Sequence, residues 1–179
     1  ERRRLDGSGV VVVLGASGSG KSSLLAAGLL ATEAVDGLLA GWSVAQLTVA
    51  DLSAGARPTV DLVVIDQAEE LFDLDEDSSP AAMTALAELA MRTVLVLAIR
   101  ADAFAAATQV PVLSHAITRP FLIAPLQRAE VREVILGPAA LAGASVEDEL
   151  VSMMLDDLPP GPQTGTVAVD VLPLLSSAL

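Results

Sequence analysis

The chain has 179 residues, of which 53% are hydrophobic, and it carries a formal net charge of −13 with no cysteine. This length and hydrophobic fraction predict one folded domain, with or without a small appendage, and exclude a disordered chain. The negative charge argues against direct binding to nucleic acid or to an anionic membrane, and the lack of cysteine excludes disulfides and thiolate metal sites. No apolar run approaches the ~18 residues of a membrane span, so we expect a cytoplasmic protein.

Strand and helix patterns alternate through the first two thirds of the chain. Continuous apolar runs predict buried strands, which end at polar residues or at glycine and proline. The expected strands span residues 10–14, 42–49, 62–65, 93–99 and 121–124, and the expected helices span residues 21–30 and 80–91. Such alternation is typical of an open, mostly parallel sheet flanked by helices, so the expected fold class is α/β.

The connection between the second and third expected strands is short. Residues 49–62 supply only about a dozen residues, which is near the minimum for a parallel crossover that normally contains a helix. We therefore expect either a bare crossover or a segment that this sequence omits.

After residue 125 the pattern becomes helical. Apolar residues at spacings of three and four predict helices over residues 128–136 and 146–155, a loop rich in proline and glycine follows at 158–165, and another helix begins at 172–179. We therefore expect a core over residues 1–125 and a small helical lid subdomain over residues 126–179, which the end of the sequence cuts short.

Residues 15–22 read GASGSGKS and match the phosphate-binding pattern G-x-x-x-x-G-K-[ST]. The motif follows a buried strand and opens a helix, where backbone N–H groups and the helix dipole favour a bound phosphate. Lys21, the only lysine of the chain, is expected to reach the β and γ phosphates, and Ser22 is expected to bind Mg²⁺. The alternative is a flexible turn without a ligand. The expected nucleotide-binding residues in this segment are Gly15, Ala16, Ser17, Gly18, Ser19, Gly20, Lys21, Ser22 and Ser23.

Acidic residues follow the third expected strand. Asp66 ends the run LVVID, beside the phosphate loop in this architecture, and is predicted to hold Mg²⁺ together with Ser22; the alternative is an ordinary helix N-cap. Glu69 and Glu70 follow at helical spacing, which turns both back toward Asp66. Either could polarise an attacking water, or both could simply favour the helix dipole. Many related hydrolases place an acid directly after the metal-binding Asp, where this chain has Gln67, which can orient a water but cannot accept its proton.

A guanidinium group lies at the end of the fourth expected strand. Arg100 ends this strand, and Asp102 follows two residues later. An arginine in this position can bind the γ-phosphate and exchange it for a carboxylate once the phosphate has left. The alternative is a surface ion pair with a nearby acid. The expected catalytic set is therefore Lys21, Asp66, Glu69, Glu70 and Arg100.

With these motifs placed, the chain resembles the STAND class of signal-transduction P-loop NTPases, and within it the bacterial novel STAND type. The segments that carry the resemblance are GASGSGKSSLLAAGLL, LVVIDQAEELF, VLVLAIRADAF, APLQRAEVREVILGPAALAG and VLPLLSSAL. The resemblance implies a P-loop fold with a parallel five-stranded sheet in the order 5-1-4-3-2, and it implies that Pro173 packs near the adenine. The F-G-R-E stretch that is usual upstream in the family is reduced here to Glu1-Arg2-Arg3.

The resemblance also implies a function. It implies a module that binds ATP or ADP with Mg²⁺, forms homo-oligomers, and lies between an N-terminal effector and C-terminal repeats of a longer protein. Such proteins act as switches in transcription control, signalling or antiviral defence, and we expect slow ATP hydrolysis. One alternative is a nucleotide-locked oligomerisation scaffold without turnover. Another is a metabolic or nucleotide kinase, which would need an arginine cluster in the lid, where residues 126–179 contain only Arg128 and Arg132.

Overall fold

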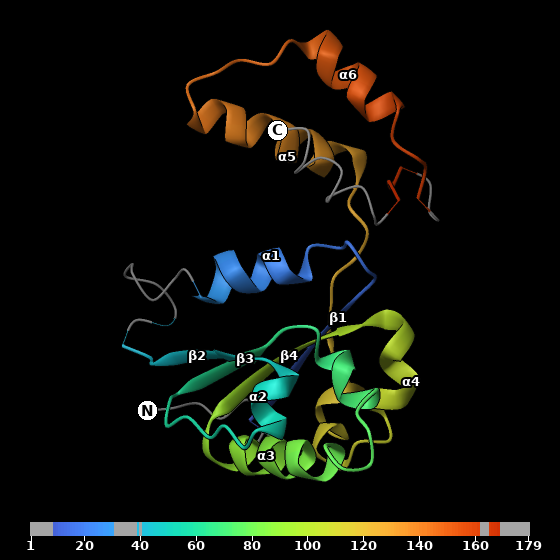
Figure 1. Ribbon diagram of the computed structural model, residues 1–179. Helices are drawn as coiled ribbons and strands as arrows, with labels where there is room; N and C mark the ends of the chain where they lie inside the picture. Colours follow the sequence, from blue (N-terminus) through green and yellow to red (C-terminus); the bar gives the residue numbers. More distant parts are fainter. Residues whose placement is uncertain (1–8, 31–38, 40, 162–164, 169–179) are drawn as a thin grey trace. The chain divides into compact units, whose positions relative to one another are not determined.

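The computed structural model describes residues 9–30, 39, 41–161 and 165–168. Its parallel sheet contains β1 (Val10–Gly15), β2 (Val44–Leu47), β3 (Leu62–Ile65), β4 (Val94–Arg100) and β5 (Phe121–Leu122). The strands pair in the order β2-β3-β4-β1-β5 (Figure 1), which is the predicted order 5-1-4-3-2 read from the opposite edge. The predicted fold class and strand order are therefore confirmed.

Helices flank this sheet on both faces. They are α1 (Lys21–Leu25), which continues as a π-helical turn over Ala26–Leu30, α2 (Val49–Ser53), α3 (Ser79–Arg92) and α4 (Phe104–Ala107). Short 3-10 turns cover Ala68–Phe72, Ala101–Ala103, Pro111–Leu113 and Ala116–Thr118. Figure 1 shows α1 on one face of the sheet and α2 and α3 on the other.

Alternate residues of the central strands supply two apolar clusters. Val63 and Leu97 belong to the cluster on the face of α2 and α3, whereas Val64 and Val96 belong to the cluster that contains Leu25 of α1. Successive side chains of a strand point to opposite faces, so a strand between two helical layers must be apolar at every position. This requirement explains the uninterrupted runs of valine, leucine and isoleucine in the sequence.

The crossover between β2 and β3 is not bare, because it contains α2. Thr48 caps this helix: its backbone N–H donates to Asp51 Oδ2 at 2.8 Å, and Asp51 N donates to Thr48 Oγ1 at 3.2 Å. The Thr48 hydroxyl also donates to Asp51 Oδ2, at 2.6 Å, and this hydrogen bond, followed by that from the Thr48 backbone N–H, lowers the pKa of Asp51. Reciprocal capping satisfies two of the N–H groups that a helix start leaves without partners, so even a helix of five residues can form in this short connection.

Gly9 precedes β1 and packs closely against the end of α3. Its φ is +65°, and a Cβ atom built on it would lie 2.9 Å from the carbonyl oxygen of Ala90 and 3.2 Å from that of Thr93. Both the left-handed backbone and the close approach require glycine here. The strand that leads to the phosphate-binding motif therefore starts from a tightly fixed point.

Two compact units make up the chain. One comprises Glu1–Gly15 with Gly20–Ile123, and the other comprises Ala16–Ser19 with Ala124–Leu179. The second unit contains α5 (Arg128–Leu141) and α6 (Asp148–Asp156). These two helices pack through Val131, Ile135, Val151 and Leu155, to which Val167 adds.

The helices of the second unit differ in part from those expected. Helix α5 runs through Pro138 to Leu141, whereas the sequence predicted an end at residue 136. The helix begun at residue 172 lies outside the described residues. Over the described part of the chain, none of the helices is both long and apolar enough to cross a membrane.

Candidate functional site

The segment GASGSGKS forms a loop between β1 and α1 that depends on two of its glycines. Gly18 has a φ of 72° and Gly20 a φ of 89°, both in the left-handed region. Gly20 is the N-cap of α1, and its carbonyl oxygen accepts from Leu24 N at 2.8 Å. Glycine adopts these angles without steric cost, so the spacing of the motif matches the backbone turn that it has to make.

Lys21 is almost fully buried, with 8% of its surface exposed. Its Nζ donates a hydrogen bond to the carbonyl oxygen of Gly15 at 3.0 Å. Burial lowers the pKa of Lys21, while the carboxylates of Glu69 and then Asp66 act in the opposite direction. The ammonium group thus lies close to the start of the loop, within the field of these two acids and of Asp102, and Arg100 adds to the lowering of the pKa.

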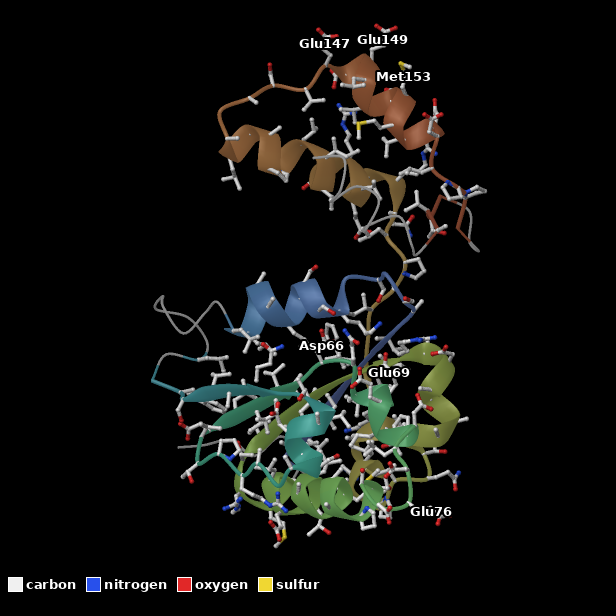
Figure 2. The ribbon with its side chains drawn as sticks, in the orientation of Figure 1. Asp66, Glu69, Glu76, Glu147, Glu149 and Met153 are labelled. Atoms are coloured by element: carbon white, nitrogen blue, oxygen red, sulfur yellow. The ribbon has the colours of Figure 1, made fainter. Side chains whose placement is uncertain are left out.

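Asp66 directly follows β3, whose last residue, Ile65, pairs with Leu97 of β4. Asp66 Oδ1 accepts a hydrogen bond from the N–H of Gln67 at 2.9 Å. The alternative role of helix N-cap is not seen, because Gln67 occupies the N-cap position of the following 3-10 turn, without a side-chain cap. Figure 2 shows Asp66 and Glu69 close together on the segment that leaves β3.

The structure separates Glu69 from Glu70, which the sequence left equivalent. Glu69 is half-buried, and its Oε2 accepts a hydrogen bond from Arg100 N at 3.2 Å. Glu70 is exposed. The turn that carries both is a 3-10 turn entered through Gln67 at φ 52° and ψ 41°, not the regular helix that the spacing argument assumed. Of the two glutamates, Glu69 and not Glu70 therefore contributes to the electrostatic field at Lys21.

Arg100 lies beside the start of the phosphate-binding loop. In the pairing of β1 with β4 it is the partner of Gly15. Its Nε donates to Asp102 Oδ1 at 3.1 Å, and a second guanidinium nitrogen contacts Asp102 Oδ2. Both side chains are about half exposed or more, so the ion pair that the sequence offered as an alternative role is present.

The remaining predicted residues vary in their surroundings. The hydroxyl of Ser19 is buried and has no hydrogen-bond partner among the described residues. Ser22 and Ser23 are exposed on the first turn of α1. Pro173, the predicted adenine contact, lies outside the described residues. Sequence analysis missed the left-handed backbone conformation of Gln67, because glutamine has no preference for a positive φ.

The fold recurs in solved structures of other proteins. Replication initiator DnaA, in a structure bound to AMPPCP and single-stranded DNA, is similar with a TM-score of 0.63 and 14% identity, over 97% of this chain and 56% of that chain. Domain III of Thermotoga maritima DnaA is similar with a TM-score of 0.62 and 12% identity, over 96% and 74%. A Walker-type ATPase of Pyrococcus abyssi is similar with a TM-score of 0.57 and 11% identity, over 90% and 60%. The chain thus spans little more than half the length of the first of these, and the identities show a shared fold alone.

Sequence comparison is more specific. No curated protein matches the chain. The family described as Novel STAND NTPase 1, however, matches it over residues 2–61 and 43–179, which together cover nearly the whole sequence. With the phosphate-binding loop, the parallel sheet and the acidic group after β3 in place, the chain belongs to the Novel STAND NTPase 1 family and is a P-loop nucleotide-binding module.

Proposed function

We propose that this module binds Mg·ATP, hydrolyses it slowly, and acts as the nucleotide-operated switch of a larger regulator in transcription control, signalling or antiviral defence. The observation that carries the proposal is the grouping of Lys21, Asp66, Glu69 and Arg100 where β1, β3 and β4 end. A buried cation, two carboxylates and a guanidinium are the groups that phosphoryl transfer to water requires.

Two features of the loop support a polyphosphate ligand. The buried Ser19 hydroxyl has no hydrogen-bond partner among the described residues, and such a group normally has one in a folded protein. The ammonium of Lys21 is buried at a cost that lowers its pKa. A phosphate oxygen that accepted a hydrogen bond would offset the cost at either group.

The residues also suit Mg²⁺. Within the described part of the chain, no group of three or more acidic or histidine side chains could hold a metal by itself. Mg²⁺ at nucleotide sites is bound by few protein oxygens, with phosphate and water completing its shell. Ser22 and Asp66 would supply those protein oxygens, and the metal would add positive charge toward the phosphates.

We assign Glu69, and not Glu70, to the attacking water. Glu69 is half-buried, bonded to the backbone of Arg100 and close enough to Lys21 to affect its pKa, whereas Glu70 is exposed. A group that orients or deprotonates water must be held within reach of the reacting phosphate. The hydrogen bond to the backbone of Arg100 and the proximity to Lys21 support this role for Glu69 and not for Glu70.

Arg100 would report which nucleotide is bound. Its guanidinium pairs with Asp102, and a γ-phosphate would compete with that carboxylate for the same donors. A ligand changes a conformational equilibrium only through different affinities for its states. The exchange of one anion for another at Arg100 would provide this difference.

The kinase alternative is disfavoured by the second unit. Its only two arginines, Arg128 and Arg132, pair with Asp156 and Asp148 and so join α5 to α6, and two arginines are fewer than the cluster that a kinase would need for an acceptor phosphate. The nucleotide-locked scaffold would bind the same nucleotides as the proposed switch, so the two functions differ only in whether ATP is hydrolysed.

Binding and turnover measurements test the proposed function. Affinities for ADP and a non-hydrolysable ATP analogue are measured with and without Mg²⁺, phosphate release is followed in single turnover, and light scattering reports assembly. We expect binding of both nucleotides, slow phosphate release and nucleotide-dependent homo-oligomers. Tight binding without phosphate release would establish the scaffold instead, and the absence of binding would contradict both.

A further inference from the structure

Gln67 has an unusual backbone conformation for its residue type. Its φ of 52° and ψ of 41° place it in the left-handed region, and it is the one non-glycine residue with a positive φ among residues 9–30, 39, 41–161 and 165–168. Left-handed angles bring Cβ close to the following carbonyl oxygen, so only glycine, and to a lesser degree asparagine and aspartate, adopts them readily. Residues strained in this way persist where the surrounding structure fixes them, and they concentrate at functional sites.

Both backbone groups of Gln67 are engaged. Its N–H donates to Asp66 Oδ1 at 2.9 Å, and its carbonyl oxygen accepts from Glu70 N at 3.1 Å. These two hydrogen bonds join the end of β3 to the 3-10 turn over Ala68–Phe72. The left-handed angles are therefore fixed from both sides, by the predicted metal ligand before Gln67 and by the turn after it.

The side chain of Gln67 contributes none of these contacts. It is exposed, and its amide makes no hydrogen bond with the described residues. The two backbone hydrogen bonds of Gln67 thus do not depend on its amide group, which sequence analysis considered as a group that could orient a water.

The direction of the chain after Gln67 determines where each following side chain lies. Ala68 and Leu71 become buried against the core, Glu69 reaches the N–H of Arg100 at 3.2 Å, and Glu70 faces solvent. The backbone angles of a single residue fix the path of the segment that follows it. A right-handed or extended Gln67 would thus redirect Glu69, although neither Asp66 nor Lys21 would change.

We infer that Gln67 is a positioning residue, whose left-handed backbone holds Glu69 toward Lys21 and Arg100. The inference deepens the proposed function and rests on the assignment of Glu69 to the attacking water. It requires the backbone angles of position 67, not its amide group.

Substitutions at this position separate backbone from side chain. Gln67→Gly and Gln67→Asn both permit the left-handed angles, whereas Gln67→Val opposes them because β-branched residues are poorly tolerated at positive φ. The matched control is Gln46→Val, the same change at an exposed position of β2. Single-turnover phosphate release, affinity for a non-hydrolysable ATP analogue and denaturant unfolding are measured for each.

We expect phosphate release by the glycine and asparagine variants to stay within about threefold of wild type. In the valine variant the rate of phosphate release should fall by on the order of 100-fold, since displacing a catalytic group by about 1 Å can have an effect of this size. Analogue affinity should remain close to wild type in all of them, because the phosphate-binding loop is unaltered. If the valine variant does not fold, Gln67→Ala is compared with the glycine and asparagine variants instead, and we expect a smaller loss of phosphate release.

A double-mutant cycle with Glu69→Gln tests the route of the effect. If Gln67 acts through Glu69, Gln67→Val changes turnover by less than about threefold once Glu69 is replaced. Equal losses in the glycine and valine variants would assign the role to the amide and overturn the inference, as would full turnover in the valine variant or additive effects in the cycle. A wild-type protein that binds ATP without any turnover would instead contradict the proposed function, and the inference with it.

Discussion

Arginine–aspartate pairs occur in both units, but in different settings. In the helical unit, Arg128 pairs with Asp156 at 2.6 Å and Arg132 pairs with Asp148, so each pair joins α5 to α6. In the sheet unit, Arg100 pairs with Asp102, only two residues away, where β4 ends. A pair that links two helices contributes to tertiary structure, whereas a pair between near neighbours holds no elements together.

The difference indicates which pair serves function. Exposed ion pairs contribute about 0.2–1 kcal/mol to stability, so stability gives little reason for Arg100 to face Asp102. Its position beside Gly15 and Glu69 gives a better one, because there the guanidinium can exchange a carboxylate for a phosphate. We therefore propose that the same chemical pair joins two helices in one unit and can release its arginine to a ligand in the other.

The largest expected effect comes from Lys21. Lys21→Met removes the only lysine and the buried ammonium, so affinity for a fluorescent ATP analogue should fall by at least about 100-fold, the effect of losing a charge-assisted contact of about 3 kcal/mol. The matched change in the other unit, Arg132→Met, should leave the affinity unaltered. Affinity of the Lys21 variant within threefold of wild type would remove the basis of the nucleotide site.

Asp66 should affect turnover more than binding. Asp66→Asn weakens the metal contact where charge develops on the phosphates, and we expect phosphate release at fixed Mg²⁺ to drop by about 100-fold. Asp73→Asn, at an exposed position after the same turn, serves as the control. An unchanged dependence of turnover on Mg²⁺ would mean that Asp66 acts only through its hydrogen bond to Gln67.

Arg100 tests the contrast between the two kinds of ion pair directly. In Arg100→Ala the preference for an ATP analogue over ADP should decrease by roughly 10- to 150-fold, the equivalent of a charge-assisted contact of about 1.5–3 kcal/mol. Arg128→Ala should leave this preference unaltered and instead lower the unfolding free energy by at most about 1 kcal/mol. Calorimetric titration of both variants with both ligands gives the comparison. Equal weakening of ATP analogue and ADP by Arg100→Ala would show a structural role.

Two glycines compare stability between the units. Gly9 and Gly143 both have a positive φ, but a Cβ on Gly9 would contact backbone oxygens, whereas nothing lies within 4 Å of one on Gly143. We expect Gly143→Ala to cost about 1 kcal/mol from strain alone, and Gly9→Ala to cost at least about 2 kcal/mol. Amide hydrogen exchange measured in β1 reports the loss of stability caused by Gly9→Ala, and exchange measured in α5 reports the loss caused by Gly143→Ala. Equal costs would mean that α3 moves aside without penalty.

The smallest effect is a dependence on pH. Burial lowers the pKa of Lys21, so the free protein loses this proton at a lower pH than an ordinary lysine would. ATP affinity should therefore begin to fall, as the pH rises, below the ordinary lysine value of 10.5. Lys21→Arg keeps its charge throughout this range and should show no such fall. Affinity that declines in parallel in both proteins would exclude Lys21 as the titrating group.

Sequence patterns predicted the sheet well because its physical requirements are strict. Strands buried between two helical layers must be apolar throughout, which marked β1, β3 and β4 unambiguously. The pattern G-x-x-x-x-G-K-[ST] requires glycine at Gly20, which the structure places at left-handed angles, whereas the equally left-handed Gly18 lies at a position that the pattern leaves open. Helix α2 could also have been expected, because Thr48 and Asp51 have the spacing of a capping box.

Other features have no local signal in the sequence. Pro138 normally ends a helix, but α5 continues past it to Leu141. The positive φ of Gln67 depends on contacts made by Asp66 and Glu70, and glutamine has no preference for it. For this reason the sequence left Glu69 and Glu70 equivalent. The difference in burial and hydrogen bonding between the two glutamates follows from tertiary structure, which the periodicity of the sequence does not encode.

Single-turnover phosphate release from Mg·ATP, compared between wild type, Glu69→Gln and Glu70→Gln, tests the central claim most directly. We expect slow release by wild type, a loss of at least about 100-fold in Glu69→Gln, within the range for removal of a general base, and release within about threefold of wild type in Glu70→Gln. Affinity for the ATP analogue should be retained in all of them. No release from wild type, or equal losses in the two variants, would contradict a hydrolytic switch built around the half-buried Glu69.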